Sequence, residues 1–192
     1  MNRLPCPSGA TVLTLRPVHG ALKAGICIAA AALLGACAPA LDWRDVRPEG
    51  ALVQLQLPCK PHGQSRDVQL GGARVNLALH ACAAGAATWG LAAADMVDPA
   101  LVGPALAELS AAAAGNLAAK PVPLQPLPVT GATPNAASGW QRLSGRLPDG
   151  KPAQMQVLVF ARGTWVYQAS VLGEKIDEAA AQTFFASLRF SP

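Results

Sequence analysis

The sequence predicts an α+β fold, in which helices pack on an antiparallel β-sheet. Two observations lead to this prediction. Stretches in which apolar and polar residues alternate, as in strands with one buried face, occur in two groups along the chain. Each group is followed by a stretch with apolar residues at helical spacing. Because short turns join most strands within each group, we expect antiparallel pairing, with both helices covering the sheet.

The first group of strands follows a segment that we interpret as a tether, residues 37–50. Residues 52–57 (LVQLQL) alternate between leucine or valine and glutamine, which predicts a strand. A later strand is predicted at 87–94, where Trp89 and Leu91 share one face.

A β-hairpin is predicted between these two strands. Its arms are residues 66–70 and 73–82, and its turn is Gly71-Gly72, a strong hairpin signal because both glycines tolerate positive φ. Residues Val75, Leu77 and Leu79 lie on one face of the second arm, and Asn76, His80 and Cys82 lie on the other.

The first helix is predicted to begin at Asp98, which suits the N-cap position, with Pro99 in the first turn. Apolar residues then recur at helical spacing to about Ala119. Residues 120–139 contain five prolines and little pattern, so we expect a proline-rich loop there.

The last third of the chain predicts a three-stranded meander and a closing helix. The meander consists of residues 140–147, 153–161 and 164–172, with turn residues between them. Asp177 suits the N-cap of a helix at 178–188, in which Ala181, Phe184, Phe185 and Leu188 form one apolar stripe. We therefore interpret residues 51–192 as a single α+β domain.

The composition indicates a folded domain that does not bind nucleic acid. The 192 residues leave room for one domain plus processing segments, and 52% hydrophobic against 14% charged residues exclude a disordered chain. Three basic residues and no acidic ones precede Cys37. This leaves 12 of the 15 Lys and Arg residues against all 11 Asp and Glu residues, too even a balance for a nucleic-acid surface.

Residues 1–36 resemble a bacterial lipoprotein signal peptide. A basic, acid-free stretch ends at Lys23 and precedes the apolar run 24–36, AGICIAAAALLGA. This run is shorter than the roughly 20 residues that span a bilayer, but it suits the apolar core of a signal peptide. It ends in Leu34-Gly35-Ala36-Cys37, which resembles the lipobox, the short motif that ends in the lipidated cysteine of such precursors.

The lipobox resemblance implies that Cys37 is the lipidation site and that cleavage before it removes residues 1–36. Two or more acyl chains then hold a protein stably on a membrane. Ala38, rather than aspartate, follows the cysteine, which favours the outer membrane and a domain facing the periplasm. The alternatives are an ordinary secreted protein and an uncleaved N-terminal anchor.

Three further short segments resemble parts of the small bacterial lipoproteins with a PsbP-like α/β/α sandwich. The segment LPCKP at 57–61 is similar to their opening motif, and RGTWVYQ at 162–168 with FFASLR at 184–189 is similar to their last strand and helix. The departures are Cys59, where a small residue is usual, and the proline-rich loop. The resemblance implies that fold and a role in binding a partner protein or assisting an assembly, and it assigns no functional residue.

Two cysteines remain once the lipoprotein features are set aside. Cys6 and Cys27 lie in the signal peptide and Cys37 is the lipidation site, which leaves Cys59 and Cys82 as a pair. In an oxidising compartment this pair predicts a disulfide. The alternative is a metal site, because Cys59, His62, His80 and Cys82 offer ligands that zinc or copper prefers.

Enzymatic function is not predicted, and neither is a cofactor. A serine nucleophile elbow, Gly-x-Ser-x-Gly, does not occur, and Gly71-Gly72 lacks the residues that complete a phosphate-binding loop. We therefore expect a non-enzymatic envelope lipoprotein that binds an envelope protein through an exposed sheet edge or the proline-rich loop. The alternative function is a periplasmic module that binds a metal or small ligand at the four Cys and His residues.

Overall fold

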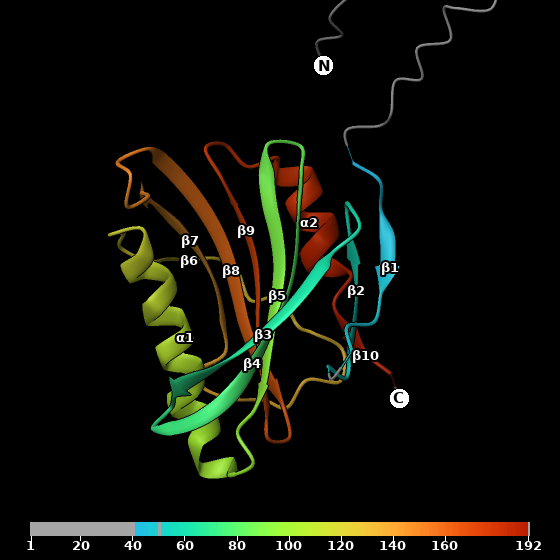
Figure 1. Ribbon diagram of the computed structural model, residues 1–192, viewed down its shortest axis with the longest axis vertical. Coiled ribbons are helices and arrows are strands. Elements are labelled where there is room, and N and C mark those ends of the chain that lie inside the picture. Colours follow the sequence, from blue (N-terminus) through green and yellow to red (C-terminus); the bar gives the residue numbers. More distant parts are fainter. Residues whose placement is uncertain (1–40, 50, 192) are drawn as a thin grey trace, which may run out of the picture. The chain divides into compact units, whose positions relative to one another are not determined.

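Strands account for about half of the described residues and far exceed the helices. The computed structural model describes residues 41–49 and 51–191, and of these 48% lie in strands and 18% in helices (Figure 1). The main sheet has seven antiparallel strands in the order β3-β4-β5-β9-β8-β7-β6. Its strands are β3 (His62–Leu70), β4 (Ala73–Ala84), β5 (Ala87–Asp95), β6 (Val122–Pro123), β7 (Gly139–Arg146), β8 (Pro152–Arg162) and β9 (Trp165–Gly173).

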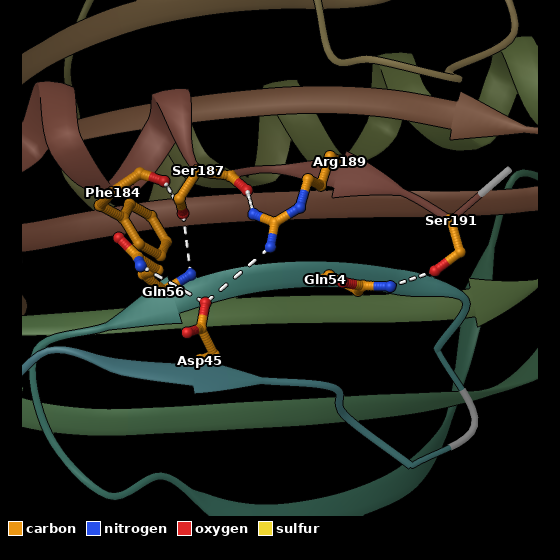
Figure 2. Close-up of polar contacts among 7 residues, drawn as sticks. All are labelled: Asp45, Gln54, Gln56, Phe184, Ser187, Arg189 and Ser191. Atoms are coloured by element: carbon orange, nitrogen blue, oxygen red, sulfur yellow. Dashed lines mark hydrogen bonds and ion pairs between the residues drawn. The ribbon is translucent and has the colours of Figure 1, made fainter.

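A smaller sheet joins the beginning of the described chain to its end. Its order is β1-β2-β10, with antiparallel pairs, and its strands are β1 (Arg44–Val46), β2 (Val53–Leu57) and β10 (Arg189–Phe190). Figure 2 shows the polar contacts between them. The backbone N–H of Gln56 donates to Ser187 Oγ at 2.8 Å, the Gln54 side chain donates to Ser191, and Arg189 forms an ion pair with Asp45.

Both aspartates that the sequence predicts as caps accept hydrogen bonds at the start of a helical segment. Asp98 accepts a hydrogen bond from the Ala100 N–H, but it caps a short 3-10 turn, η1 (Pro99–Leu101), and α1 (Val102–Asn116) follows. Asp177 accepts hydrogen bonds from the Ala179 and Ala180 N–H groups at the start of α2 (Glu178–Ala186).

Two apolar clusters lie on opposite faces of the main sheet. On one face Leu106 and Leu109 of α1, together with Leu117 directly after it, pack against β8 and β9 residues such as Val157 and Val166. The other face is covered by α2 together with the smaller sheet. There Trp89 of β5 makes an edge-to-face contact with Phe184 of α2, with ring centroids 5.6 Å apart.

The predicted α+β class, a PsbP-like α/β/α sandwich, is wrong, because the protein is mostly β. Strands form at 44–46, 122–123 and 189–190, where the sequence has no strand-like alternation. The hairpin arm that was predicted at 66–70 also begins four residues earlier, at His62. Among the described residues, one α-helix packs on each face of the main sheet, and the second face is shared with three further strands.

Burial changes the titration of Tyr167, which lies within an aromatic cluster. Its ring stacks on Phe160 at 5.1 Å and contacts the edge of Phe190 at 5.3 Å, and the residue is fully buried. Burial raises the pKa of Tyr167 to about 12. In an unfolded chain the phenol ionises near pH 10.

We expect the free energy of unfolding to fall between about pH 10 and about pH 12. In this window the unfolded chain has lost the Tyr167 proton and the folded protein still holds it, so rising pH favours the unfolded state; below the window the full stability is present. Urea denaturation across this range measures the effect. The variant Tyr167→Phe keeps the ring without the titrating group, and an equally steep loss of stability in that variant would contradict the assignment.

Candidate binding site

The cysteine pair predicted from the sequence lies at bonding distance. Cys59 and Cys82 form a disulfide with an S–S distance of 2.00 Å and a Cα–Cα distance of 5.9 Å. Cys59 follows β2 and Cys82 lies on β4, so the bond links the smaller sheet to the main one. The predicted lipidation site, Cys37, lies outside the described residues.

The four residues of the alternative metal site do not converge. The two sulfur atoms are bonded to each other, which removes both thiolate ligands. His80 pairs with Gly63 across β3 and β4, whereas His62 pairs with Ala81, so the two imidazoles leave opposite faces of the sheet. Throughout residues 41–49 and 51–191, no group of three or more His, Cys, Asp or Glu side chains could hold a metal ion.

A cleft of about 570 Å³ opens between α1 and the edge strand β3. Its floor is the sheet surface formed by Leu77 and Leu79 of β4, Ala92 of β5 and Gln168 of β9. One wall is β3 and the other is α1; the wall residues include Val68 and Leu70 on β3 and Leu109, Ala112 and Ala113 on α1. The floor and walls therefore offer mainly aliphatic contacts.

The path of α1 across the sheet creates this cleft. Near its start, α1 packs on the β3–β4 turn, where Gly71 has a φ of +58° and donates its N–H to Glu108 at 2.7 Å. A Cβ at Gly71 would lie 2.9 Å from the Ala105 nitrogen, so only glycine fits. Past its far end, the Leu117 carbonyl accepts a hydrogen bond from Arg146 on β7. The helix thus crosses from the β3 side of the sheet to β7 (Figure 1) and leaves Leu77 and Leu79 only partly covered.

β3 borders the cleft and is an edge strand. It pairs with β4 along all nine residues, and no other strand in the described part of the chain pairs with its second side. In an antiparallel ladder, alternate residues direct their N–H and C=O groups to opposite sides of the strand, so β3 presents a row of free backbone groups. Most of its side chains are exposed, from His62 to Asp67 without interruption.

Polar groups surround the apolar floor. Gln64 and Arg66 of β3 and Glu108 and Asn116 of α1 line its rim, and Gln168 is the one polar residue of the floor. The Glu108 carboxylate accepts the Gly71 hydrogen bond described above. An apolar floor within a polar rim is the usual anatomy of a site that binds a ligand or a peptide.

The sequence identified part of this site. It placed Val75, Leu77 and Leu79 on one face of β4, and the structure turns that face toward α1. It also named an exposed sheet edge as a binding surface, without locating it. The sequence did not predict that α1 forms one wall of a cleft. Alanines such as Ala112 and Ala113 occur equally on a helix face that lines a cleft and on one that is fully packed. The proline-rich loop predicted at 120–139 contains the short strand β6 and lies elsewhere.

No protein-family model matches the chain, and no curated protein matches it in sequence. The resemblance to the PsbP-like lipoproteins is therefore carried by its short motifs alone. No helix within the described ranges has both the length and the apolar composition that crossing a bilayer requires.

Proposed function

We propose that this protein is a membrane-anchored envelope lipoprotein whose folded domain is a non-enzymatic module that binds an extended segment of a partner protein along β3. The observation that supports the proposal best is the position of the free β3 edge directly beside the α1 cleft. Strand addition to an exposed edge is a common mode of peptide recognition, in which backbone hydrogen bonds supply affinity and side-chain pockets supply specificity.

The geometry of β3 defines the partner segment. A strand added to β3 would continue the ladder with its own N–H and C=O groups. Every second side chain of that strand would point to the α1 face of the sheet. There an apolar side chain could pack on Val68, Leu77 and Leu79. The segment that fits is therefore extended, with apolar residues at alternate positions.

The exposed polar groups favour a segment of mixed charge over a purely apolar one. Arg66 on β3 and Glu108 on α1 lie on the rim, where a carboxylate and an ammonium group of the partner would find opposite charges. Asp67 points to the opposite face of β3, where it already contacts Arg74 and Asn76 at 3.2 Å. Arg66 and Glu108, on the α1 side of the sheet, are therefore the charged residues that would select the partner segment.

Site-specific photocrosslinking in the native membrane tests the proposal. A photoreactive residue at Ser65 or at Val68, both on β3, should capture the same partner peptide, and one at the exposed Thr183 of α2 should not. Intact mass from the same membranes should show a chain that begins at Cys37 with added acyl mass.

A cleft variant sharpens this experiment. Leu79→Gln places a polar amide on the cleft floor and should lower the crosslinking yield at Val68 about tenfold, as expected for loss of one buried apolar contact. Leu52→Gln makes the same change at a leucine that is 57% exposed and does not line the cleft, so its yield should stay unchanged. Equal capture at Ser65, Val68 and Thr183 would reject strand addition.

A further inference from the structure

The folded domain begins close to the proposed lipid anchor. Leu41 packs on the β4–β5 turn, where its Cδ2 would lie 3.0 Å from a Cβ at Gly85. The next residue, Asp42, donates its N–H to the Pro58 carbonyl at 2.9 Å, and Trp43 makes an edge-to-face contact with Trp89. Most of the segment predicted as a tether, residues 37–50, is therefore part of the fold.

The link between Cys37 and the domain is short. Four peptide links separate Cys37 from Leu41, and at roughly 3.5 Å for each residue they reach about 14 Å even when fully extended. The anchor cysteine must therefore lie within about 14 Å of the point where Leu41 meets the β4–β5 turn.

Three turns lie side by side at this end of the domain (Figure 1). They are the β4–β5 turn at Gly85-Ala86, the β7–β8 turn at 148–150 and the segment after β9 at 174–175; we name them together the anchor end. Strand register brings them together, because Ala87 pairs with Gly173 and Gly173 also pairs with Gln154.

The surface of the anchor end suits contact with a bilayer. It contains an open hollow of about 760 Å³ that is lined mostly by alanines and other apolar groups: Ala83, Ala84, Ala86, Ala87, Ala153 and Leu172. Lys151 at its rim forms an ion pair with Asp149 at 2.9 Å, and Glu174 also lines the hollow, with Lys175 next to it in the chain. The two acidic side chains here, Asp149 and Glu174, are matched in number by Lys151 and Lys175, so this surface carries no net charge that would repel an anionic bilayer.

We propose that the anchor end rests against the bilayer that holds Cys37, and that the short link keeps it there. This inference rests on the proposed lipid anchor. β4 extends 12 residues from its end at the anchor end back to the Gly71-Gly72 turn, so that turn lies up to about 40 Å from the membrane surface. The partner of the anchor end is thus the lipid surface itself, and the β3 edge runs obliquely away from that surface (Figure 1).

Depth-dependent quenching tests the orientation. The lipidated protein is placed in vesicles of phosphatidylethanolamine and phosphatidylglycerol, with a fluorophore on a single added cysteine at Pro148 or at Ala100. Both positions are exposed; Pro148 lies at the anchor end and Ala100 lies on η1, far from it. Lipids that carry a nitroxide in the head-group region should remove most of the emission at Pro148→Cys and little at Ala100→Cys.

Lengthening the link between Cys37 and the domain tests whether the short link is what holds the anchor end at the membrane. About 20 Gly and Ser residues inserted after Ala38 would add a root-mean-square span of about 25 Å, and quenching at Pro148→Cys should then largely disappear. Equal quenching at both positions with the native link, or quenching that survives the insertion, would overturn the inference. Intact mass is read first: a chain without acyl mass at Cys37 refutes the anchor, whereas an acylated chain with the wrong quenching pattern refutes only the orientation.

Discussion

Replacing Gly145 with alanine is expected to lower the free energy of unfolding by about 3 kcal/mol, at the upper end of what overpacking costs. A Cβ at this position on β7 would lie 2.0 Å from the Leu117 carbonyl oxygen and 3.1 Å from the Ala119 Cβ. The carbonyl belongs to the backbone just beyond α1, and it also accepts the Arg146 hydrogen bond at 2.9 Å. Relief of the clash therefore requires the end of α1 to move away from the sheet.

Urea denaturation of Gly145→Ala measures this loss. Gly139→Ala is the matched control, because it lies on the same strand and a Cβ there would meet no atom within 4 Å. We expect the control to unfold at nearly the urea concentration of the native sequence. If both variants unfold alike, the close approach of the Leu117 carbonyl to β7 does not exist in solution.

Removal of the disulfide by the double substitution Cys59→Ala and Cys82→Ala is expected to lower the free energy of unfolding by about 3 kcal/mol. The bond closes a loop with a sequence separation of 23 residues, and the loss comes mainly from the greater freedom of the unfolded chain. Cys82 is buried, so alanine rather than serine avoids leaving a hydroxyl without a partner there.

A reducing agent provides the control for the disulfide prediction. Urea denaturation of the native sequence should shift to lower urea when a reductant is present, and the doubly substituted variant should not respond to it. The variant should also unfold close to the reduced native protein, since both lack the same link. Identical unfolding of the native sequence with and without reductant would show that the bond does not stabilise the fold.

Local patterns in the sequence predicted most of the long strands. The Gly71-Gly72 turn, the alternation in β2 and the meander of β7, β8 and β9 lie where they were expected, within a few residues. These features can be predicted from neighbouring residues alone. Alternation of apolar and polar residues indicates a strand with one buried face, and a Gly-Gly pair indicates a turn with positive φ.

The missed strands depend on contacts between residues far apart in the chain. β1 has three residues and β10 has two, and they form because β2 lies between them. The first half of β3 is polar and exposed, so it shows no alternation; it extends to His62 because β4 offers hydrogen bonds along its whole length. These additions made the fold mostly β and the predicted class wrong.

Only part of the candidate site could be predicted from the sequence, because the rest also depends on contacts between residues far apart in the chain. The apolar face with Leu77 and Leu79 follows from alternation, but whether a helix covers it depends on where that helix crosses the sheet. The crossing is set by close approaches at Gly71 and Gly145, which a single sequence does not reveal. The order of the strands, which makes β3 an edge, is likewise a property of the whole fold.

Copies anchored in one membrane would all present β3 in the same direction. β3 runs from His62, which pairs with Ala81 near the anchor end, to Leu70 beside the Gly71-Gly72 turn. Antiparallel pairing of two such edges would require one copy to stand upside down, with its Cys37 pointing away from the lipid. Upright neighbours could meet only in parallel, the weaker arrangement. Even at high density in the membrane, pairing between the β3 edges of two copies would thus be hindered. Each β3 edge would stay free to pair with a strand from another protein.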